Sequence, residues 1–260
     1  MACGECQNSE LRLVPVGEAA LLVEFGQRID DAVNERVHAL AADLAKSDYP
    51  WLVDLTPAFA SLLVCYDPLQ IEFAALCELV RCRLAAVAGG NAAVRRVVEI
   101  PVCYQDEFAP DMADMEKLTG LDREEIIALH SGRDYKIYML GFLPGFPYLG
   151  GLDERIAAPR LDSPRVRIEP GSVGIGGAQT GIYPLASPGG WRLIGRTPLA
   201  LYDPEREQPV FYKAGDLIRF VPISREEYAA LQADVEAGRW QPVFHSQAAD
   251  NADLNCKEGA

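Results

Sequence analysis

Basic residues are scarce in this chain. Its 24 lysines and arginines stand against 38 aspartates and glutamates, a formal net charge of −14 at pH 7. Because they form no cluster, the sequence lacks the positive surface that binds nucleic acid or an anionic membrane. No apolar run approaches the roughly 20 residues that span a bilayer, and the first ten residues lack the basic start of a signal peptide. We expect a cytoplasmic protein that binds neither nucleic acid nor membrane.

Several familiar catalytic motifs are also absent. The sequence has no phosphate-binding loop of the form G-x-x-x-x-G-K-[S/T] and no G-x-S-x-G serine elbow. Gly174-Ile-Gly-Gly-Ala-Gln179 is a near miss to the dinucleotide-binding pattern, but the following Thr180-Gly-Ile-Tyr-Pro184 is unsuited to the helix that this pattern requires. Nucleotide binding or hydrolysis by this chain alone is therefore disfavoured.

The cysteines indicate neither disulfides nor a metal site. There are seven of them, an odd number, and they are scattered along the sequence. Cys3-Gly-Glu-Cys6 is a lone C-x-x-C without the second pair that a zinc site needs. We expect reduced thiols and no metal bound by this chain. Residues 1–10 are expected to be a disordered tail and residues 241–260 a mobile one.

The hydrophobic content is 49%, and 260 residues are enough for two small domains, each with its own core. Residues 11–90 show the pattern strand, strand, helix twice. This pattern predicts an α+β, sandwich-like N-terminal domain with helices on one side of a mainly antiparallel sheet. The elements expected there are strands 11–16, 20–25, 51–55 and 61–66, a helix opening at Asp30 and a helix carrying Phe73 to Val87.

From residue 91 to residue 240 the pattern changes to two short helices and then to short strands separated by glycine and proline turns. Asp111 and Asp122 are expected to cap the two helices. The recurring strands predict a closed C-terminal β-barrel. A last helix should begin at Ser224, which forms a capping box with Glu227.

Residues 141–200 differ from the rest of the chain. They hold 12 of the 22 glycines and 8 of the 18 prolines, together with many aliphatic and aromatic residues that a flexible linker would lack. They also contain six arginines, no lysine and four acidic residues, a count of +2 within a chain of −14. A locally positive, glycine-lined surface suits a small anionic ligand, so we look for function here.

Arginine without lysine favours planar ligands, because the guanidinium fork binds carboxylate, phosphate or carboxamide groups with defined geometry. Arg165, Arg192 and Arg196 are candidates for polarising an amide carbonyl or holding a phosphate, with Thr197 beside the last. We predict a catalytic role for Arg196 and substrate binding for the other three. The alternative is that these arginines are ordinary surface or barrel-rim residues.

Three glycines form a second candidate group. The amides of Gly174, Gly176 and Gly177 are expected to form an anion-binding loop, with side-chain hydrogen bonds from Gln179 and Thr180. We predict that Gln179 is catalytic and that Thr180 binds substrate. Tight barrel turns are the alternative explanation for the same glycines.

Aromatic residues and one histidine complete the candidate site. Phe146 and Trp191 are expected to wall a flat pocket, and Tyr183 to offer its hydroxyl, although all three also suit barrel packing. His130 precedes Ser131-Gly132 at a helix C-terminus, where the helix dipole favours a capping imidazolium. The alternative is that His130 is a proton donor or acceptor near the arginines. Under this alternative we predict that His130 is catalytic.

The same region carries a resemblance to a known family. It rests on three runs: Tyr138-Met-Leu-Gly-Phe-Leu-Pro-Gly-Phe-Pro-Tyr-Leu149, Gly177-Ala-Gln-Thr-Gly-Ile-Tyr-Pro184 and Ser187-Pro-Gly-Gly-Trp-Arg-Leu-Ile-Gly-Arg-Thr-Pro198. These runs closely resemble the family of the 5-oxoprolinase B subunit (PxpB), which includes the sporulation kinase inhibitor KipI and allophanate hydrolase subunit 1. The resemblance extends from about Arg12 to about Pro222.

The resemblance implies one component of an ATP-dependent 5-oxoprolinase, which converts 5-oxo-L-proline to L-glutamate with ADP and phosphate. It implies the 5-oxoprolinase C subunit as a close partner and the A subunit as a second one, with ATP bound on or shared with a partner. It also implies that the C-terminal half is a cyclophilin-like barrel. Two alternatives are a KipI-like inhibitor that binds a sensor histidine kinase and a carboxyltransferase-like module related to urea carboxylase.

Overall fold

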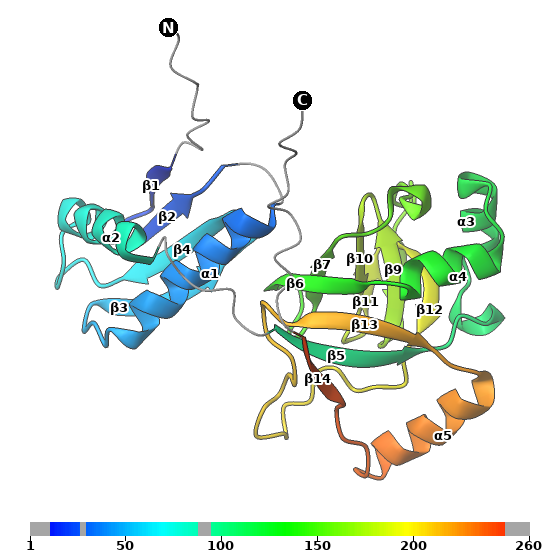
Figure 1. Ribbon diagram of the computed structural model, residues 1–260. Coiled ribbons are helices and arrows are strands. Elements are labelled where there is room, and N and C mark those ends of the chain that lie inside the picture. Colours follow the sequence, from blue (N-terminus) through cyan, green and yellow to red (C-terminus); the bar gives the residue numbers. More distant parts are fainter. Residues whose placement is uncertain (1–10, 27–29, 88–94, 248–260) are drawn as a thin grey trace, which may run out of the picture. The chain divides into compact units, whose positions relative to one another are not determined.

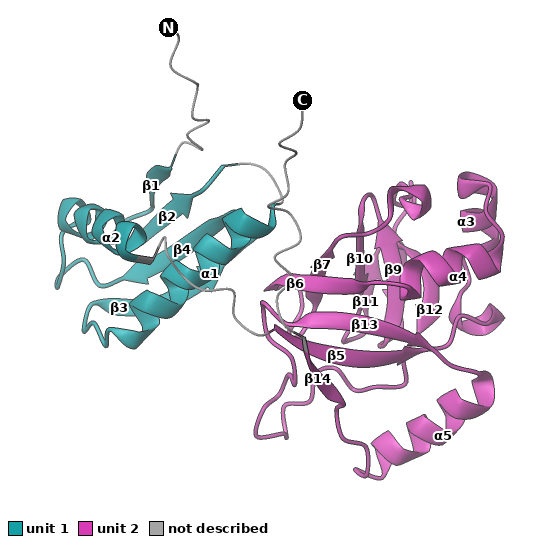
Figure 2. Cartoon of the chain, viewed as in Figure 1, with its two compact units in different colours: residues 1–91 teal, residues 92–260 magenta. Residues whose placement is uncertain are grey.

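The computed structural model describes residues 11–26, 30–87 and 95–247. The chain divides into two compact units, unit 1 (residues 1–91) and unit 2 (residues 92–260), shown in separate colours in Figure 2. The predicted N-terminal tail, residues 1–10, lies outside the described residues, as does the junction between the units.

Unit 1 confirms the predicted pattern of strand, strand, helix, repeated once. Its four strands form one antiparallel sheet in the order β1-β2-β4-β3, and two helices complete the unit (Figure 1). The elements are β1 (Arg12–Val16), β2 (Ala20–Glu24), α1 (Asp31–Lys46), β3 (Leu52–Pro57), β4 (Ser61–Tyr66) and α2 (Phe73–Val87).

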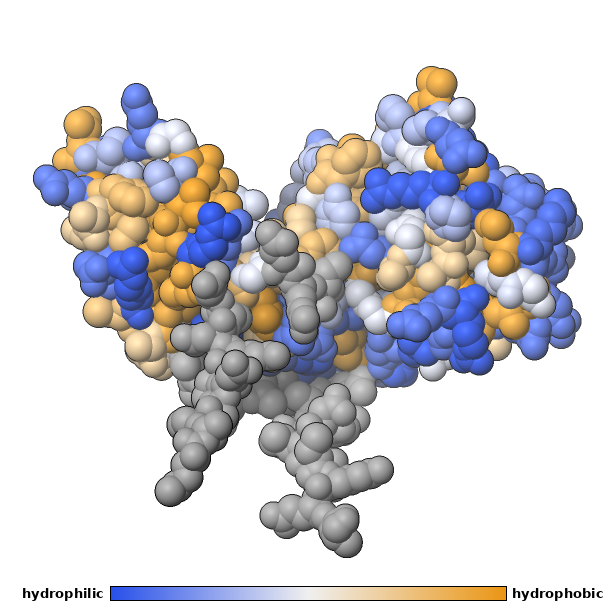
Figure 3. All heavy atoms as spheres, turned by 90° about the horizontal axis from the view of Figure 1, so that it is seen from above, coloured by the Kyte–Doolittle hydropathy of each residue, from blue (hydrophilic) through white to orange (hydrophobic). Residues whose placement is uncertain are grey.

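One core fixes the two helices of unit 1 to one face of the sheet. Alternate residues of β2 and β4, such as Leu21 and Leu62, are fully buried and share a cluster with Leu40 of α1 and Val80 of α2. This period of two is what a half-buried strand requires. In the view of Figure 3 a hydrophobic band crosses unit 1, whereas the hydrophobic residues of unit 2 are scattered among hydrophilic ones.

Unit 2 is built on an eight-stranded sheet with the order β12-β9-β10-β7-β6-β13-β5-β14, plus a separate pair, β11-β8. Its strands are β5 (Arg95–Val102), β6 (Asp134–Leu140), β7 (Pro147–Gly150), β8 (Arg165–Ile168), β9 (Ser172–Gly176), β10 (Gln179–Ile182), β11 (Ser187–Gly189), β12 (Arg192–Arg196), β13 (Leu217–Pro222) and β14 (Phe244–Gln247). Its helices are α3 (Met112–Thr119), α4 (Arg123–Ser131) and α5 (Arg225–Glu236), with two short 3₁₀ turns, η1 (Asp106–Phe108) and η2 (Glu154–Ile156).

Within the described residues this sheet does not close into the predicted cyclophilin-like barrel. It curls strongly, with β5, β13 and β6 running across β9, β10 and β12 in Figure 1. The two sides meet only where Cys103 forms a single bridge with Arg196. β14 pairs with the other end of β5, Arg95–Val98, and forms the edge of the sheet on that side. The mobile tail predicted from residue 241 is therefore wrong for Phe244–Gln247, which form a strand.

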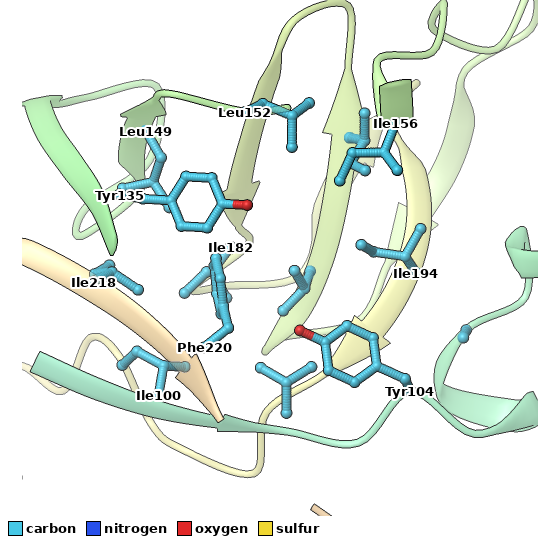
Figure 4. Close-up of a cluster of buried hydrophobic side chains, with 14 of the residues drawn as sticks. Ile100, Tyr104, Tyr135, Leu149, Leu152, Ile156, Ile182, Ile194, Ile218 and Phe220 are labelled. Atoms are coloured by element: carbon cyan, nitrogen blue, oxygen red, sulfur yellow. The ribbon is translucent and has the colours of Figure 1, made fainter. Parts of the chain in front are cut away.

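The curled sheet encloses the main hydrophobic core of unit 2. Strands from both sides contribute to it, including Ile100 of β5, Phe220 of β13 and Ile194 of β12 (Figure 4). Figure 4 also shows the hydroxyl groups of Tyr104 and Tyr135 pointing into this cluster. Buried hydroxyls need hydrogen-bond partners, so the core must contain a polar group.

Helix caps agree with the sequence at two positions and differ at a third. Asp122 and Ser224 each form the capping box expected at the start of α4 and α5. Asp111 precedes α3, but its side chain makes no capping hydrogen bond. Its carboxylate instead accepts from Arg165 and from the backbone N–H of Leu193, so the predicted cap at Asp111 is wrong. Among the described helices, none combines the length and the apolar character needed to traverse a lipid bilayer.

Candidate functional site

Three of the predicted site residues form an aromatic cluster in unit 2. Phe146, Tyr183 and Trp191 come from loops next to β7, β10 and β12, and all three are at least 95% buried. The Phe146 ring meets Tyr183 and Trp191 edge-on, with centroids 5.3 Å and 5.7 Å apart. Tyr148 lies 5.1 Å from Phe146 and extends the same cluster. The rings pack on one another as a buried hydrophobic cluster, and their role as the walls of a pocket stays a prediction.

Glycines of β9 and β10 allow Trp191 to lie against the sheet. A Cβ atom at Gly176 would lie 2.6 Å from the indole, and one at Gly181 would lie 3.0 Å from it. Gly174 and Gly176 are thus strand residues, and Gly177, at φ +67°, opens the two-residue turn between β9 and β10. The anion-binding loop that we predicted is a strand and a hairpin turn, with Gln179 at the turn's far end. The amide of Gly177 already donates to Ala158, at 2.7 Å.

Two of the predicted arginines, Arg165 and Arg192, are already bonded to groups of this chain. The Arg165 guanidinium donates to the Asp111 carboxylate at 2.5 Å, and the backbone N–H of Leu193 donates to the other carboxylate oxygen at 2.6 Å. Arg192 donates to the carbonyl of Pro159 at 2.9 Å. Both arginines therefore hold loops of unit 2 together, and the charge of Arg165 is largely compensated within the chain.

Arg196 and Thr197 contact a different set of groups. The guanidinium of Arg196 lies over the Phe108 ring, 5.9 Å from its centroid, and interacts with the hydroxyl of Tyr228. Its Nε–H is buried and has no hydrogen-bond partner within the described chain. The Thr197 hydroxyl is buried and accepts from the N–H of Leu199 at 3.3 Å. Nothing in these contacts joins Arg196 or Thr197 to the rings around Trp191.

His130 and Thr180 lie in the core of unit 2, where they satisfy the buried tyrosines. The Thr180 hydroxyl donates to the carbonyl of Gly174 at 3.1 Å, so it accepts from His130 Nε2, 2.9 Å away. His130 Nδ1 then accepts from the hydroxyl of Tyr104 at 2.8 Å, and Tyr135 donates to the His130 carbonyl. Burial lowers the pKa of His130 to about 3.

This geometry corrects both interpretations of His130. A fully buried, neutral ring with both nitrogens engaged is neither a capping imidazolium nor a group that reaches a ligand. Thr180 is likewise fully buried and committed to His130 and Gly174. Sequence reasoning missed their shared role because the partners are 50 residues apart in the chain.

Sequence analysis did not assign two further residues to the site. Asp111 joins α3 to Arg165 and β12, contacts that no local pattern reveals. Arg160 lies over Trp191, with its guanidinium carbon 5.8 Å from the ring centroid. Arg160 is one of the six arginines of residues 141–200, but no sequence motif distinguishes it from the other five. Across residues 11–26, 30–87 and 95–247, no group of three or more His, Cys, Asp or Glu side chains is placed to hold a metal ion.

Comparison with known proteins identifies the family. A family model described as the carboxyltransferase domain, subdomain C and D, matches residues 11–212. This chain belongs to that family. The 5-oxoprolinase B subunit of Bacillus subtilis is 45% identical over 229 residues, which cover 84% of this chain and 95% of that relative. The resemblance to the 5-oxoprolinase B subunit seen in the sequence is thereby confirmed.

Two solved structures contain a similar fold within longer chains. The protein TTHA0988 is 38% identical with a TM-score of 0.70, and the match covers 79% of this chain but 40% of that one. The urea carboxylase of Kluyveromyces lactis has a TM-score of 0.73 at 20% identity, covering 91% of this chain and 24% of that enzyme. This chain therefore spans less than half the length of these two structural relatives.

Proposed function

We propose that this chain is one component of an ATP-dependent 5-oxoprolinase, which opens the lactam of 5-oxo-L-proline to L-glutamate. The observation that carries the proposal is the 45% identity to a 5-oxoprolinase B subunit over 95% of that protein's length. The name of that relative implies a complex with further subunits. We propose the C subunit as a close partner and the A subunit as a second one, all acting in the cytoplasm.

Coupling to ATP is chemically reasonable for this reaction. A lactam carbonyl is a poor electrophile, and transfer of the γ-phosphoryl group to its oxygen makes the carbon open to attack by water. The ring C–N bond then breaks and the nitrogen takes up a proton, which leaves an acyl phosphate. A second water molecule hydrolyses this acyl phosphate to the carboxylate of L-glutamate and free phosphate. Because the sequence has no phosphate-binding loop, we propose that ATP binds on, or is shared with, a partner protein of the complex.

The aromatic cluster is the part of this chain best suited to the substrate. Phe146 and Tyr183 pack edge-on against Trp191, and the lactam ring would stack on the indole face that Arg160 covers. Arg165 and Arg192 hold the surrounding loops in place through Asp111 and Pro159. They act in this proposal as positioning residues. Gln179 and Arg196 stay predictions as catalytic residues, and Thr197 as a substrate ligand.

A carboxyltransferase-like module is the second candidate, and the fold shared with urea carboxylase favours it. It predicts a reaction that depends on biotin, whereas the oxoprolinase proposal does not. The histidine-kinase inhibitor stays a prediction from the sequence resemblance.

The test is phosphate release from ATP with and without 5-oxo-L-proline. This chain is assayed alone and then mixed with the homologues of the 5-oxoprolinase A and C subunits from its own genome. We expect lactam-dependent release only in the complete mixture. If no mixture releases phosphate in response to the lactam, with all three proteins folded, the proposal is contradicted. Lactam-independent activity that requires biotin would favour the carboxyltransferase alternative.

A further inference from the structure

One arginine beside the aromatic cluster lacks an anionic partner. Of the six arginines in residues 141–200, four lie within 4 Å of a carboxylate: Arg155 with Asp153, Arg165 with Asp111, Arg167 with Glu169 and Arg192 with Asp114. Arg196 is stacked on Phe108. Across the described residues, the side chain of Arg160 makes neither an ion pair nor a hydrogen bond, and Arg160 is exposed. An unpaired guanidinium is available to bind an anion.

The backbone on both sides of Arg160 is nevertheless held firmly. The carbonyl of Pro159 accepts from Arg192 Nε at 2.9 Å, and the N–H of Leu161 donates to the carbonyl of Gly190 at 2.7 Å. The base of the Arg160 side chain is thus fixed next to Trp191, while its charged end is free to turn. An arginine restrained in this way loses less conformational freedom when it binds a ligand.

The guanidinium also lies near the hydroxyl of Tyr183. Burial raises the pKa of Tyr183, and the positive charges of Arg160 and Arg165 act in the opposite direction. A Cβ atom at Gly189 would lie 2.5 Å from the hydroxyl oxygen of Tyr183, so the glycine is needed for the hydroxyl to sit there.

We propose that Arg160 binds the carboxylate of a small planar substrate whose ring stacks on Trp191. The guanidinium leaves the indole face, turns about its fixed backbone and pairs with the carboxylate, while the ring takes its place on the indole. The exchange is favourable because a charge-assisted hydrogen bond to a carboxylate is stronger than an exposed cation–π contact. The identity of the ligand as 5-oxo-L-proline rests on the proposed function.

The first test uses the assembled complex and compares Arg160→Gln with Arg155→Gln. Arg155 is exposed and paired with Asp153, so its variant is a matched loss of one surface charge. We expect Arg160→Gln to raise the KM for 5-oxo-L-proline about ten-fold or more while kcat changes little, and Arg155→Gln to leave both unchanged. An unchanged KM in Arg160→Gln would overturn the inference and leave the proposed function intact.

A second test separates the inference from the proposed function. If the wild-type mixture shows no lactam-dependent phosphate release, the proposed function is contradicted. NMR titration of this chain alone then tests whether Arg160 binds the carboxylate. A shift of the Trp191 indole N–H with 5-oxo-L-proline that is absent in Arg160→Gln supports it. No shift in the wild type, or an equal shift with 2-pyrrolidinone, which lacks the carboxylate, contradicts it.

Discussion

Lowering the pH from 7.5 to 5 should destabilise unit 2 through a single buried residue, His130. Its ring is fully buried, donates to Thr180 and accepts from Tyr104, an arrangement that requires the neutral imidazole. Burial lowers its pKa from 6.5 to about 3. Above pH 6.5 the ring is neutral in both states, so it makes no pH-dependent contribution. Below that pH the unfolded chain takes up a proton that the folded chain does not, and stability falls until about pH 3.

The size of this loss follows from the two pKa values. At pH 5 the unfolded state is favoured by a factor of about 30 relative to neutral pH, or about 2 kcal/mol. This is a substantial part of the roughly 5–15 kcal/mol that stabilises a typical domain. Carboxylates whose pKa is lowered in the folded state, such as Asp153 beside Arg155, contribute a loss only below about pH 5. The interval from pH 6.5 to pH 5 therefore isolates the histidine.

The assay is urea unfolding at half-unit pH steps, followed by tryptophan fluorescence in a Trp51→Phe background, so that Trp191 and Trp240 report on unit 2. His130→Gln should be less stable at pH 7.5 but should lose the slope between pH 6.5 and 5. His245→Gln, which changes a half-exposed ring bonded to Glu99, is the matched control and should keep it. An identical slope in wild type and His130→Gln would refute the reasoning.

Substitutions at three further positions test single contacts in unit 2 by urea unfolding. Gly176→Ala places a methyl group 2.6 Å from the Trp191 indole and should cost about 1–3 kcal/mol; a neutral result would mean that the indole moves freely. Asp111→Asn leaves Arg165 without its carboxylate and should cost about 2–4 kcal/mol, a loss that a change under about 0.5 kcal/mol would contradict. Ser224→Ala removes the side-chain cap of α5 and should cost about 1 kcal/mol, whereas Ser224→Asp should retain most of the stability.

The sequence predicted most of the local structure because local structure depends on residues close together in the chain. The alternation in β2 and β4, the capping boxes at Asp122 and Ser224 and the two strand, strand, helix units of unit 1 all appear where the pattern placed them. The concentration of glycine and arginine in residues 141–200 likewise pointed to the aromatic cluster. Each of these signals spans only a few residues.

The tertiary structure decided what those residues do. Asp111 was expected to cap a helix, but partners 54 and 82 residues away take its carboxylate. His130 was expected either to cap a helix or to transfer protons near the arginines, and its contacts with Tyr104 and Thr180 place it in the core.

The same is true of the sheet and of the arginines. The sheet ends in β14 instead of closing into the predicted barrel, and β14 lies in the segment that was predicted to be a mobile tail. Ion pairs leave Arg160 as the unpaired guanidinium beside Trp191. Contacts between distant segments depend on the packing of the whole unit, and no short stretch of sequence encodes them.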